Sequence, residues 1–492
     1  MNSQLIEWLN QKYGYEISEE YYKHIDIWLD WWRGYYKPFH HIKFSNGKQL
    51  IERDMRTLGM GKKVCEDWAS MLLNSKTHIK ISDEKTNLFM QGERETKGVL
   101  GNNSFWTKAS KVIERAFATG TGAVTIHVSK IKLGGNNNDS FIVEKSPEAQ
   151  IQLNYLSAEF IIPLSVDNDR ITEAAFASET FSKGKKYLLL EVHRINDIGN
   201  YVIENYRFLV KDEQLEEVAL NENMIAKFDT GAPLPWFSIL MPNIENNTEC
   251  SNGLGLSVLH NAIYELQTVD ICFNNFGSDF TLGQKKVFME KGLLEKDELG
   301  NQIAPDDVHQ QMFSFIDFPV ENNGEDTSRF IMEFNPSLRV EENTKAIQSA
   351  LDYLSLKVGF GCKHYQFNAG TIVTAKQYEG DKQDLVQNAD KHYIAIEQFL
   401  LSLMQSIIHI GKHLIGADIA ENAKIEIDFD RSIIIDSTAE RLQDLQEVRE
   451  GVMSKWEYRA KYYNESESEA KAKIDEINGT QNDDALMGFG DA

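Results

Sequence analysis

GLSVLHNAIYELQTVDICFNNFGSDFTL, at residues 255–282, and VEENTKAIQSALDYLSLKV, at residues 340–358, are the two stretches that decide the fold. In both, apolar residues recur at steps of three and four, the period of one face of an α-helix. They are Leu259, Ile263, Leu266, Phe273, Phe276 and Phe280 in the first stretch, and Ile347, Leu351, Leu354 and Val358 in the second. Asp270 interrupts the first series. We therefore predict two amphipathic helices that flank whatever lies between them.

Between these helices, the 54 residues from Gly283 to Pro336 contain strand-like runs at 286–289, 313–318 and 330–334, separated by acidic turns. Such runs predict a compact insertion that contains β-strands. An antiparallel helix pair brings the two ends of an insertion together. The sequence therefore predicts a helical stalk with a small β-containing module at its tip.

The most regular period follows the second helix. Apolar residues alternate steps of four and three at Ala389, Tyr393, Ile396, Leu400, Leu403, Ile407, Ile410 and Leu414. A helix from Thr374 to Ile415 is expected to be about 63 Å long, which suits a segment that spans a larger body. Gly380 is a possible bend, and Gly416 is expected to end the helix. Residues 424–429 alternate as a strand.

The apolar periodicity of the N-terminal half predicts helices followed by a β-sheet. Helical stripes run through 18–34 and 54–73, and from Gly120 the period changes to two. Strand-like runs at 171–181, 186–195, 200–210 and 215–220 are joined by short polar turns, which is typical of an antiparallel meander. No helical pattern lies between these runs, so a doubly wound nucleotide-binding sheet is disfavoured. The fold class predicted is α+β.

The C-terminal part, from residue 431, is helical and polar. Ser454 and Glu457 have the spacing of a capping box, and Gly451 is expected to end the helix before it. The last 29 residues hold eight acidic residues and two lysines, which gives a net charge of −6. A solvated end is the simpler interpretation of this acidic tail, and a docking role is the alternative.

Composition limits the function. The chain has 492 residues, for which about three structural units are expected. It carries 75 acidic residues against 51 Lys and Arg, a net charge of −24, so tight sequence-independent binding of phosphates is disfavoured. Cys65, Cys250, Cys272 and Cys362 form no CxxC pair and are expected to be small buried thiols. No secretory signal is visible, and the apolar run at 399–411 is too short for a membrane span.

Signatures of catalysis are weak. Gly59-Met60-Gly61-Lys62-Lys63 lacks the first glycine and the Ser/Thr of a phosphate loop. His409 and His413 lie four residues apart on a predicted helix, but no Glu follows the first histidine, so solvated or core-edge histidines are expected rather than a metal site. We therefore predict a protein that is not an enzyme and that needs no cofactor.

A family resemblance joins these elements. Pro235-Trp236-Phe237, residues 253–258 (GLGLSV) and residues 283–288 (GQKKVF) resemble portal proteins of tailed bacteriophages that infect Gram-positive bacteria. Residues 31–36 (WWRGYY) and 60–72 resemble the N-terminal part of that family, and residues 436–477 resemble its C-terminal part.

The resemblance implies the portal fold with wing, stem, clip and crown. The wing would be residues 1–250 and 374–430, the stem 251–282 and 340–358, the clip 283–339, the tunnel loop 359–373, and the crown with its acidic tail 431–492. It also implies a homo-oligomeric ring, dodecameric in the phage, at one capsid vertex of the virion, assembled in the host bacterial cytoplasm. Double-stranded DNA would pass through this channel during packaging and ejection. Implied partners are the terminase large subunit, a head-tail adaptor, and the major capsid and scaffolding proteins, with no membrane.

The channel residues follow from that resemblance. The tunnel loop and its flanks would present Lys357, Lys363, His364, Tyr365, Phe367 and Lys376, and the first stem helix would present Glu265, Asp270 and Asp279. A channel through which DNA slides should avoid strong phosphate binding, and the first stem helix has no Lys or Arg. The lysines near the loop would either make weak transient contacts with DNA or only keep the loop soluble.

Two other functions stay open. One is a metal-dependent nucleic-acid-processing enzyme of a mobile element, in which acidic residues would hold Mg²⁺. The other is a non-channel structural protein, such as a head-tail adaptor or a minor capsid component. A closed ring with an axial hole would distinguish the portal from both.

Overall fold

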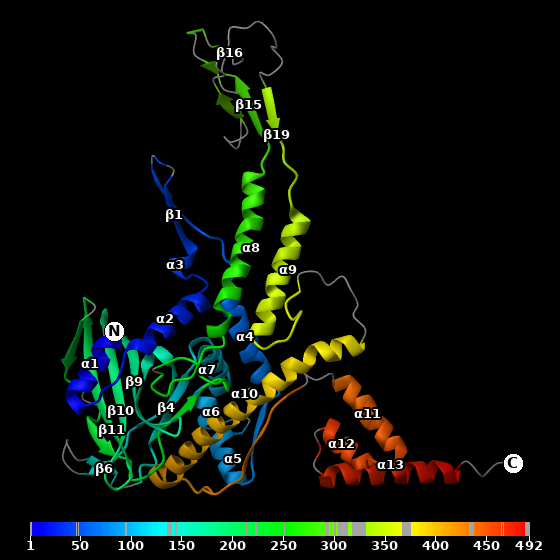
Figure 1. Cartoon of the computed structure of the whole chain (residues 1–492). Coiled ribbons are helices and arrows are strands. Elements are labelled where there is room, and N and C mark those ends of the chain that lie inside the picture. The colour runs from blue at the N-terminus through cyan, green and yellow to red at the C-terminus, as the bar shows by residue number, and fades with distance from the viewer. Residues whose placement is uncertain are drawn as a thin grey trace, which may run out of the picture. The chain divides into compact units, whose positions relative to one another are not determined.

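We describe the protein from a computed structural model of residues 1–492 (Figure 1). The description excludes residues 1, 46, 48, 94–95, 135–139, 143–144, 213, 222–223, 250, 291–294, 297, 300–301, 304–312, 317–330, 367–374, 432–436, 464, 466 and 488–492. The chain divides into two compact units, Met1–Phe429 and Asp430–Ala492. Each unit is described by itself.

The N-terminal helices form where aromatic residues repeat on one face. They are α1 (Asn2–Tyr13), α2 (Glu20–Arg33), α3 (Lys37–His40), α4 (Met60–Leu72), α5 (Glu84–Gln91), α6 (Val99–Asn102) and α7 (Phe105–Thr119). The helix predicted at 54–73 begins later, at Met60, because Gly59 is in the left-handed region with φ 69°. The hairpin of β1 (His41–Ser45) and β2 (Leu50–Asp54) precedes that glycine.

The predicted meander is confirmed. Strands β8 to β12 pair in sequence order and antiparallel within one large sheet. Lys183 and Gly184 both have positive φ and close the β9–β10 hairpin, a two-residue loop whose twist matches that of the strands. The strands of this sheet are β5 (Leu133–Gly134), β6 (Ser140–Ile142), β8 (Ile161–Asp167), β9 (Arg170–Ser182), β10 (Lys185–Ile195), β11 (Tyr201–Lys211), β12 (Gln214–Val218) and β13 (Lys227–Asp229).

A second sheet of three strands, β14-β4-β7, contains β4 (Gly122–Ser129), β7 (Gln150–Ser157) and β14 (Phe237–Leu240). The main core lies between α1, α2 and the inward faces of both sheets. It includes Ile25 and Trp28 from α2, Leu188 and Leu190 from β10, and Phe237 from β14, all buried. Mixed helix and sheet content of this kind confirms the α+β class.

The long helix α10 (Ala375–Ile410) continues into one π-helical turn, Gly411–Ile415, and ends at Gly416 with φ 79°, as predicted for that glycine. Within the described residues, one helical stretch, Gln383–Ile415, is long and apolar enough to cross a membrane, although the run at 399–411 alone was expected to be too short. Because 56% of its most apolar window is buried in the chain, the stretch has the character of a core helix. Strand β20 (Ile425–Asp428) follows and pairs with β3 (His78–Ile81).

The two helices of the opening prediction are α8 (Ile263–Leu282) and α9 (Val340–Lys357), which lie side by side (Figure 1). Helix α8 begins eight residues later than residue 255, after turns and a short 3₁₀ segment at His260–Ala262. Between them, β15 (Lys286–Glu290) pairs with β18 (Phe313–Ile316) in parallel and with β19 (Ile331–Phe334) antiparallel. A further hairpin joins β16 (Glu295–Lys296) and β17 (Gln302–Ile303). The predicted β-containing insertion is therefore present.

The second unit contains α11 (Ser437–Glu450), α12 (Lys455–Tyr463) and α13 (Glu467–Met487). The capping box is confirmed: the Ser454 amide and hydroxyl donate to Glu457 Oε2 at 2.8 Å, and the Glu457 amide donates back to Ser454 Oγ at 3.3 Å. Gly451 has φ 77° directly after α11, as predicted for a helix end.

Candidate functional site: the stem and the loop after it

The stem, which we define as α8 and α9, is held together by an apolar seam. Leu266 and Val269 of α8 and Ile347, Leu351 and Leu354 of α9 are buried. The spacing that predicted the helices therefore also selected the face through which they pair.

The far ends of the two stem helices are joined by ionic contacts. Arg339 donates from Nε and Nη2 to the two oxygens of Asp279, at 3.1 and 2.7 Å, and Asn343 Nδ2 donates to the same carboxylate at 2.7 Å. These donors hold the pKa of Asp279 below its usual value. Asp279 is thus tied to α9 rather than free at the stem surface.

Asp270, expected to face a channel, instead lies inside the chain. It is 5% exposed, its Oδ2 lies 3.0 Å from His40 Nε2, and its Oδ1 accepts a hydrogen bond from the Leu58 amide at 2.7 Å. Burial raises the pKa of Asp270 against the lowering effect of these two partners. The expectation for this residue needs correction, because a side chain covered by its own chain cannot line a lumen in this conformation. Its interruption of the apolar seam marks a polar contact with the N-terminal segment.

Glu265 is half-buried on α8. Its Oε2 is buried and has no hydrogen-bond partner among the described residues. Of the three acids named from the sequence, Glu265 is thus the one with a carboxylate oxygen that makes no hydrogen bond to another described residue.

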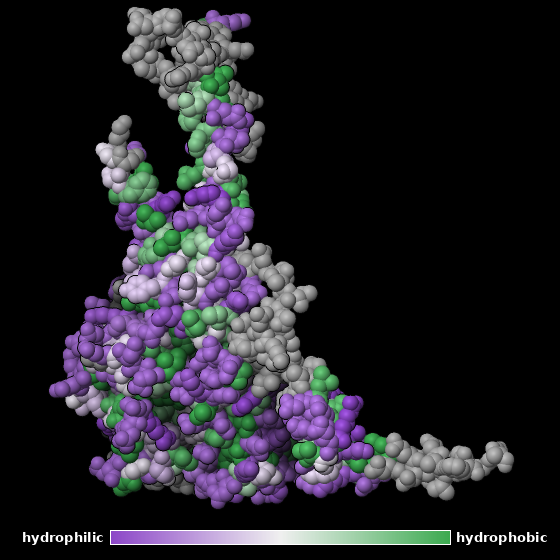
Figure 2. All heavy atoms as spheres, turned by 45° about the vertical axis from the view of Figure 1, so that its right-hand side comes forward, coloured by the Kyte–Doolittle hydropathy of each residue, from purple (hydrophilic) through white to green (hydrophobic). Residues whose placement is uncertain are grey.

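The outer surface of the stem carries large apolar side chains. Tyr264 is 81% exposed and Tyr353 is 67% exposed, and five further apolar side chains are 42–67% exposed. That set is Ile271, Phe280 and Leu282 on α8, and Val340 and Leu356 on α9. Figure 2 shows hydrophobic side chains along the stem surface. Clustered apolar area of this kind on a single copy marks an interaction surface.

The loop after α9 is anchored by aromatic packing. Trp68 of α4 stacks on Phe360 with ring centroids 4.6 Å apart, and Trp68 Nε1 donates to the Val358 carbonyl at 3.1 Å. His364 also stacks on Phe360, with ring centroids 4.3 Å apart. The first part of the predicted tunnel loop is therefore fixed to the body.

The predicted loop residues divide by exposure. Lys357, Lys363 and His364 are exposed, and Lys363 has φ 65°. Tyr365 turns inward: its hydroxyl donates to Asp67 at 3.0 Å, and burial raises its pKa. Phe367 lies outside the described residues, and so does the side chain of Lys376, whose backbone belongs to α10.

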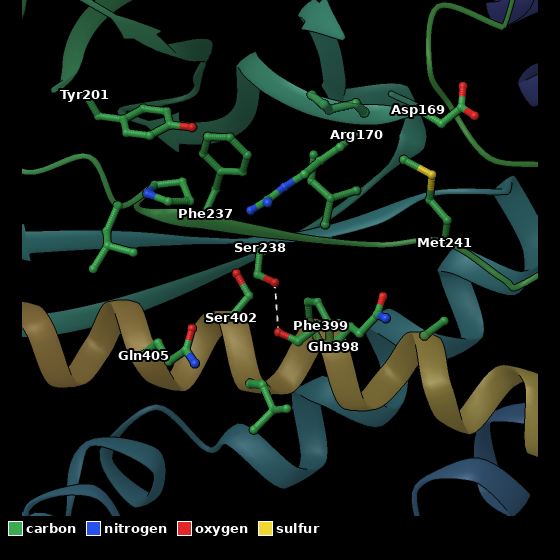
Figure 3. Close-up of a pocket in the computed structure, with 16 residues that line it drawn as sticks. Asp169, Arg170, Tyr201, Phe237, Ser238, Met241, Gln398, Phe399, Ser402 and Gln405 are labelled. Atoms are coloured by element: carbon green, nitrogen blue, oxygen red, sulfur yellow. Dashed lines mark hydrogen bonds between the residues drawn. The ribbon is translucent and has the colours of Figure 1, made fainter. Parts of the chain in front are cut away.

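A cavity of about 580 Å³ lies between β14 and α10 (Figure 3). In its wall, the Ser238 Oγ of β14 donates to the Phe399 carbonyl of α10 at 2.8 Å. Asp169 and Arg170 are the charged residues among those that line it, and the rest are apolar, amide or hydroxyl side chains. A nucleophile with an adjacent general base, which acyl or phosphoryl transfer would need, is not found among these lining residues.

Two details differ from the sequence-based expectations. Cys65 is buried, but Cys272 is half-buried and Cys362 is exposed, so the expectation of uniformly buried thiols is wrong for these two, while Cys250 lies outside the described residues. The fold also brings Glu421 against His409 and His413, which sequence spacing alone did not pair. One signal in the sequence could have indicated this contact. Glu421 lies eight residues beyond His413, and Gly416, which ends the helix, lets the chain turn back between them.

The chain thus combines an α+β body with a paired-helix stem whose exposed apolar side chains mark an interaction surface. A model of the phage portal protein family, described as SPP1 Gp6-like, matches residues 10–484, so the chain belongs to that family. Family membership confirms the predicted resemblance and gives a portal or connector role in a bacteriophage virion. Portal proteins are structural, which agrees with the expectation of a non-enzymatic chain.

Two solved structures match the chain at low similarity. A chain from the neck of a native gene transfer agent particle, computed with C12 symmetry, is 10% identical, with a TM-score of 0.36; the match covers 81% of this chain and 88% of that one. A chain from the virion of a native gene transfer agent particle gives 10% identity, a TM-score of 0.32 and the same coverages. No curated protein sequence matches the chain.

Proposed function

We propose that copies of this chain close into a ring through their stems and that double-stranded DNA passes along the axis during packaging and ejection. The observation that carries the proposal is the apolar outer surface of the stem, where Tyr264, Tyr353 and Leu282 are each at least two-thirds exposed in a single copy. Neighbouring stems would cover these side chains, which supplies a driving force proportional to the area removed from water.

The charge of the stem supports a bore that repels DNA. Helix α8 contains Glu265, Asp270 and Asp279 and no Lys or Arg. Asp270 is buried and Asp279 is tied to Arg339. Glu265 is only half-buried, and its Oε2, covered in the single copy, has no hydrogen-bond partner among the described residues, so it is our candidate for an acid that faces the channel. Lys357 and Lys363, both exposed, are candidates for weak contacts with passing phosphates.

The roles of the remaining segments follow in the proposal. The wing comprises 1–250 and 374–430, the clip 283–339, the tunnel loop 359–373 and the crown 431–492. The terminase large subunit and later the head-tail adaptor would dock to the ring, and the capsid and scaffolding proteins would surround it at the vertex. Twelve subunits in the virion and assembly in the host cytoplasm belong to the same proposal.

The test is the oligomeric state of the purified full chain by negative-stain electron microscopy and light scattering. We expect closed rings with an axial hole for the wild type. The double variant Tyr353→Glu/Leu356→Glu should remain monomeric but folded by circular dichroism. Ile198→Glu, at a position 77% exposed in the turn between β10 and β11, is the matched control and should still form rings. A wild-type chain that stays monomeric, or rings that persist in the stem variant, would contradict the proposal.

A further inference from the structure

The C-terminal end of the long helix carries a compact cluster of nitrogen and oxygen donors. His409 Nδ1 lies 2.8 Å from Glu421 Oε1, and His413 Nε2 lies 2.8 Å from Glu421 Oε2. The two imidazole centroids are 4.4 Å apart. One donor atom from each of the three side chains lies within 4.8 Å of the other two. Each oxygen of the Glu421 carboxylate thus contacts one of the two imidazole rings, and both rings lie on the same face of the helix.

We propose that His409, His413 and Glu421 bind a divalent transition-metal ion of the zinc type. Two imidazoles and one carboxylate are a donor set that suits Zn²⁺, whereas Mg²⁺ and Ca²⁺ prefer oxygen donors alone. Zn–N and Zn–O distances are about 2.0–2.2 Å, so small rotations of the three side chains would bring the donors onto one ion. The ion would replace the protons that now link each ring to the carboxylate.

The local backbone holds the three donors in place. His413 lies in the π-helical turn Gly411–Ile415 that ends the long helix, and such single turns occur frequently at functional sites. The chain then folds back: the Ala417 amide donates to the Gly411 carbonyl at 2.9 Å, and Lys412 Nζ donates to the Ile419 carbonyl at 2.6 Å. These bonds set the position of Glu421 relative to the helix. The site is therefore supported by the backbone and does not depend on three freely moving side chains.

The surroundings leave room for a further ligand. His409 and His413 border a cavity of about 340 Å³ whose other wall includes Asp229, Thr230 and Trp236. A three-residue site needs a fourth ligand for tetrahedral zinc, and water from this cavity can supply it. The side chains of His409, His413 and Glu421 are 19%, 55% and 39% exposed, so an ion in solution has access.

A bound ion would join the end of α10 to the segment that leads into β20. Helix α10 is the longest in the described part of the chain, and β20 pairs with β3 near the N-terminal helices. The expected consequence is structural: metal binding should stabilise the folded chain, because an ion that binds the native state and not the unfolded state shifts the unfolding equilibrium.

The experiment uses tag-free full chain, stripped with EDTA and titrated with ZnCl₂ by isothermal calorimetry, with CoCl₂ as a spectroscopic probe. We expect about one Zn²⁺ per chain, an intense visible Co²⁺ band typical of tetrahedral sites, and a rise in melting temperature on adding Zn²⁺. His409→Ala, His413→Ala and Glu421→Gln should each weaken Zn²⁺ binding by more than about 100-fold, since even loss of a group that only supports a ligand costs about 10–100-fold.

His78→Ala is the matched control, an exposed histidine on β3, and should bind as the wild type does. The metal-free melting temperature of every variant shows whether it folds, so loss of binding is separated from loss of structure. Unchanged Zn²⁺ affinity in the His409→Ala/His413→Ala double variant would overturn the proposal. The proposal would also fail if the wild type bound no Zn²⁺ at a concentration of about 100 µM.

Discussion

At the scale of single residues, Trp68 connects the body to the loop after the stem. It is fully buried, stacks on Phe360 and donates to the Val358 carbonyl. Trp68→Ala should lower the free energy of unfolding by about 3–5 kcal/mol, because it removes a large buried ring and leaves a cavity. Urea unfolding followed by circular dichroism measures the change. Trp106→Ala, at a residue 37% exposed, should cost clearly less; equal costs would show that the Trp68 packing is not specific.

The buried Asp270 gives a second prediction at this scale, concerning pH. Its pKa is raised in the folded chain, so the folded state binds a proton more readily than the unfolded state. The free energy of unfolding of the wild type should therefore fall, relative to Asp270→Asn, as pH rises from below the ordinary Asp pKa of about 3.8 to above the raised value. Parallel denaturant titrations between about pH 3.5 and 7 test this. A difference that stays constant across that range would contradict the assignment.

The sequence pattern predicted helices and strands better than it predicted which side chains contact one another. The apolar steps in 340–358 located α9 and also its buried face. The resemblance places Asp270 among the channel-facing acids, because nothing in its spacing shows that His40 and the Leu58 amide, more than 200 positions away, converge on it. Glu421 was missed for the same physical reason: pairing across a chain reversal depends on tertiary structure, whereas the histidine pair depends only on helical period.

At the scale of elements, boundaries were set by glycines and caps. Gly416 and Gly451 end their helices with positive φ, as the sequence indicated, whereas Gly59 delays α4 because a residue in the left-handed region cannot continue a helix. The hairpin at 41–54 was not predicted, because its strands are short and mostly exposed and therefore carry little apolar alternation.

The capping box of α12 provides an element-scale prediction. Ser454→Ala removes both hydroxyl contacts with Glu457 and should destabilise the helix locally by about 1 kcal/mol, whereas Ser454→Gly should cost only a few tenths. Hydrogen exchange of the amides of residues 455–458 reports this change directly. Equal exchange in the wild type and Ser454→Ala would show that the cap does not stabilise the helix.

At the scale of the whole molecule, net charge and the proposed channel act together. The chain is strongly acidic, and the first stem helix has no cation. We therefore expect rings to bind linear double-stranded DNA no more tightly than ordinary non-specific binding, about 10⁻⁴–10⁻⁶ M at physiological salt.

Reversing one stem charge tests which surface faces the DNA. Glu265→Lys should tighten DNA binding by rings and steepen its salt dependence, because each subunit then presents a cation to the phosphates. Fluorescence anisotropy at 50–200 mM salt, a range in which about 10³-fold changes are typical for phosphate contacts, measures the slope. Glu249→Lys, an exposed acid ahead of the stem, is the control and should leave the slope nearer that of the wild type. Indistinguishable slopes in the two variants would exclude Glu265 from the bore.

The ionic contacts among Asp279, Arg339 and Asn343 have one more consequence. They fasten the chain where it leaves the first stem helix and where it returns to the second. The intervening segment is thus a β-containing insertion whose ends are already held together, and for a flexible loop closed in this way each doubling of length costs only about 0.6 kcal/mol. Insertions or exchanges between residues 284 and 338 should be tolerated by the rest of the chain. We expect the two stem helices to keep their length and pairing when this segment is exchanged.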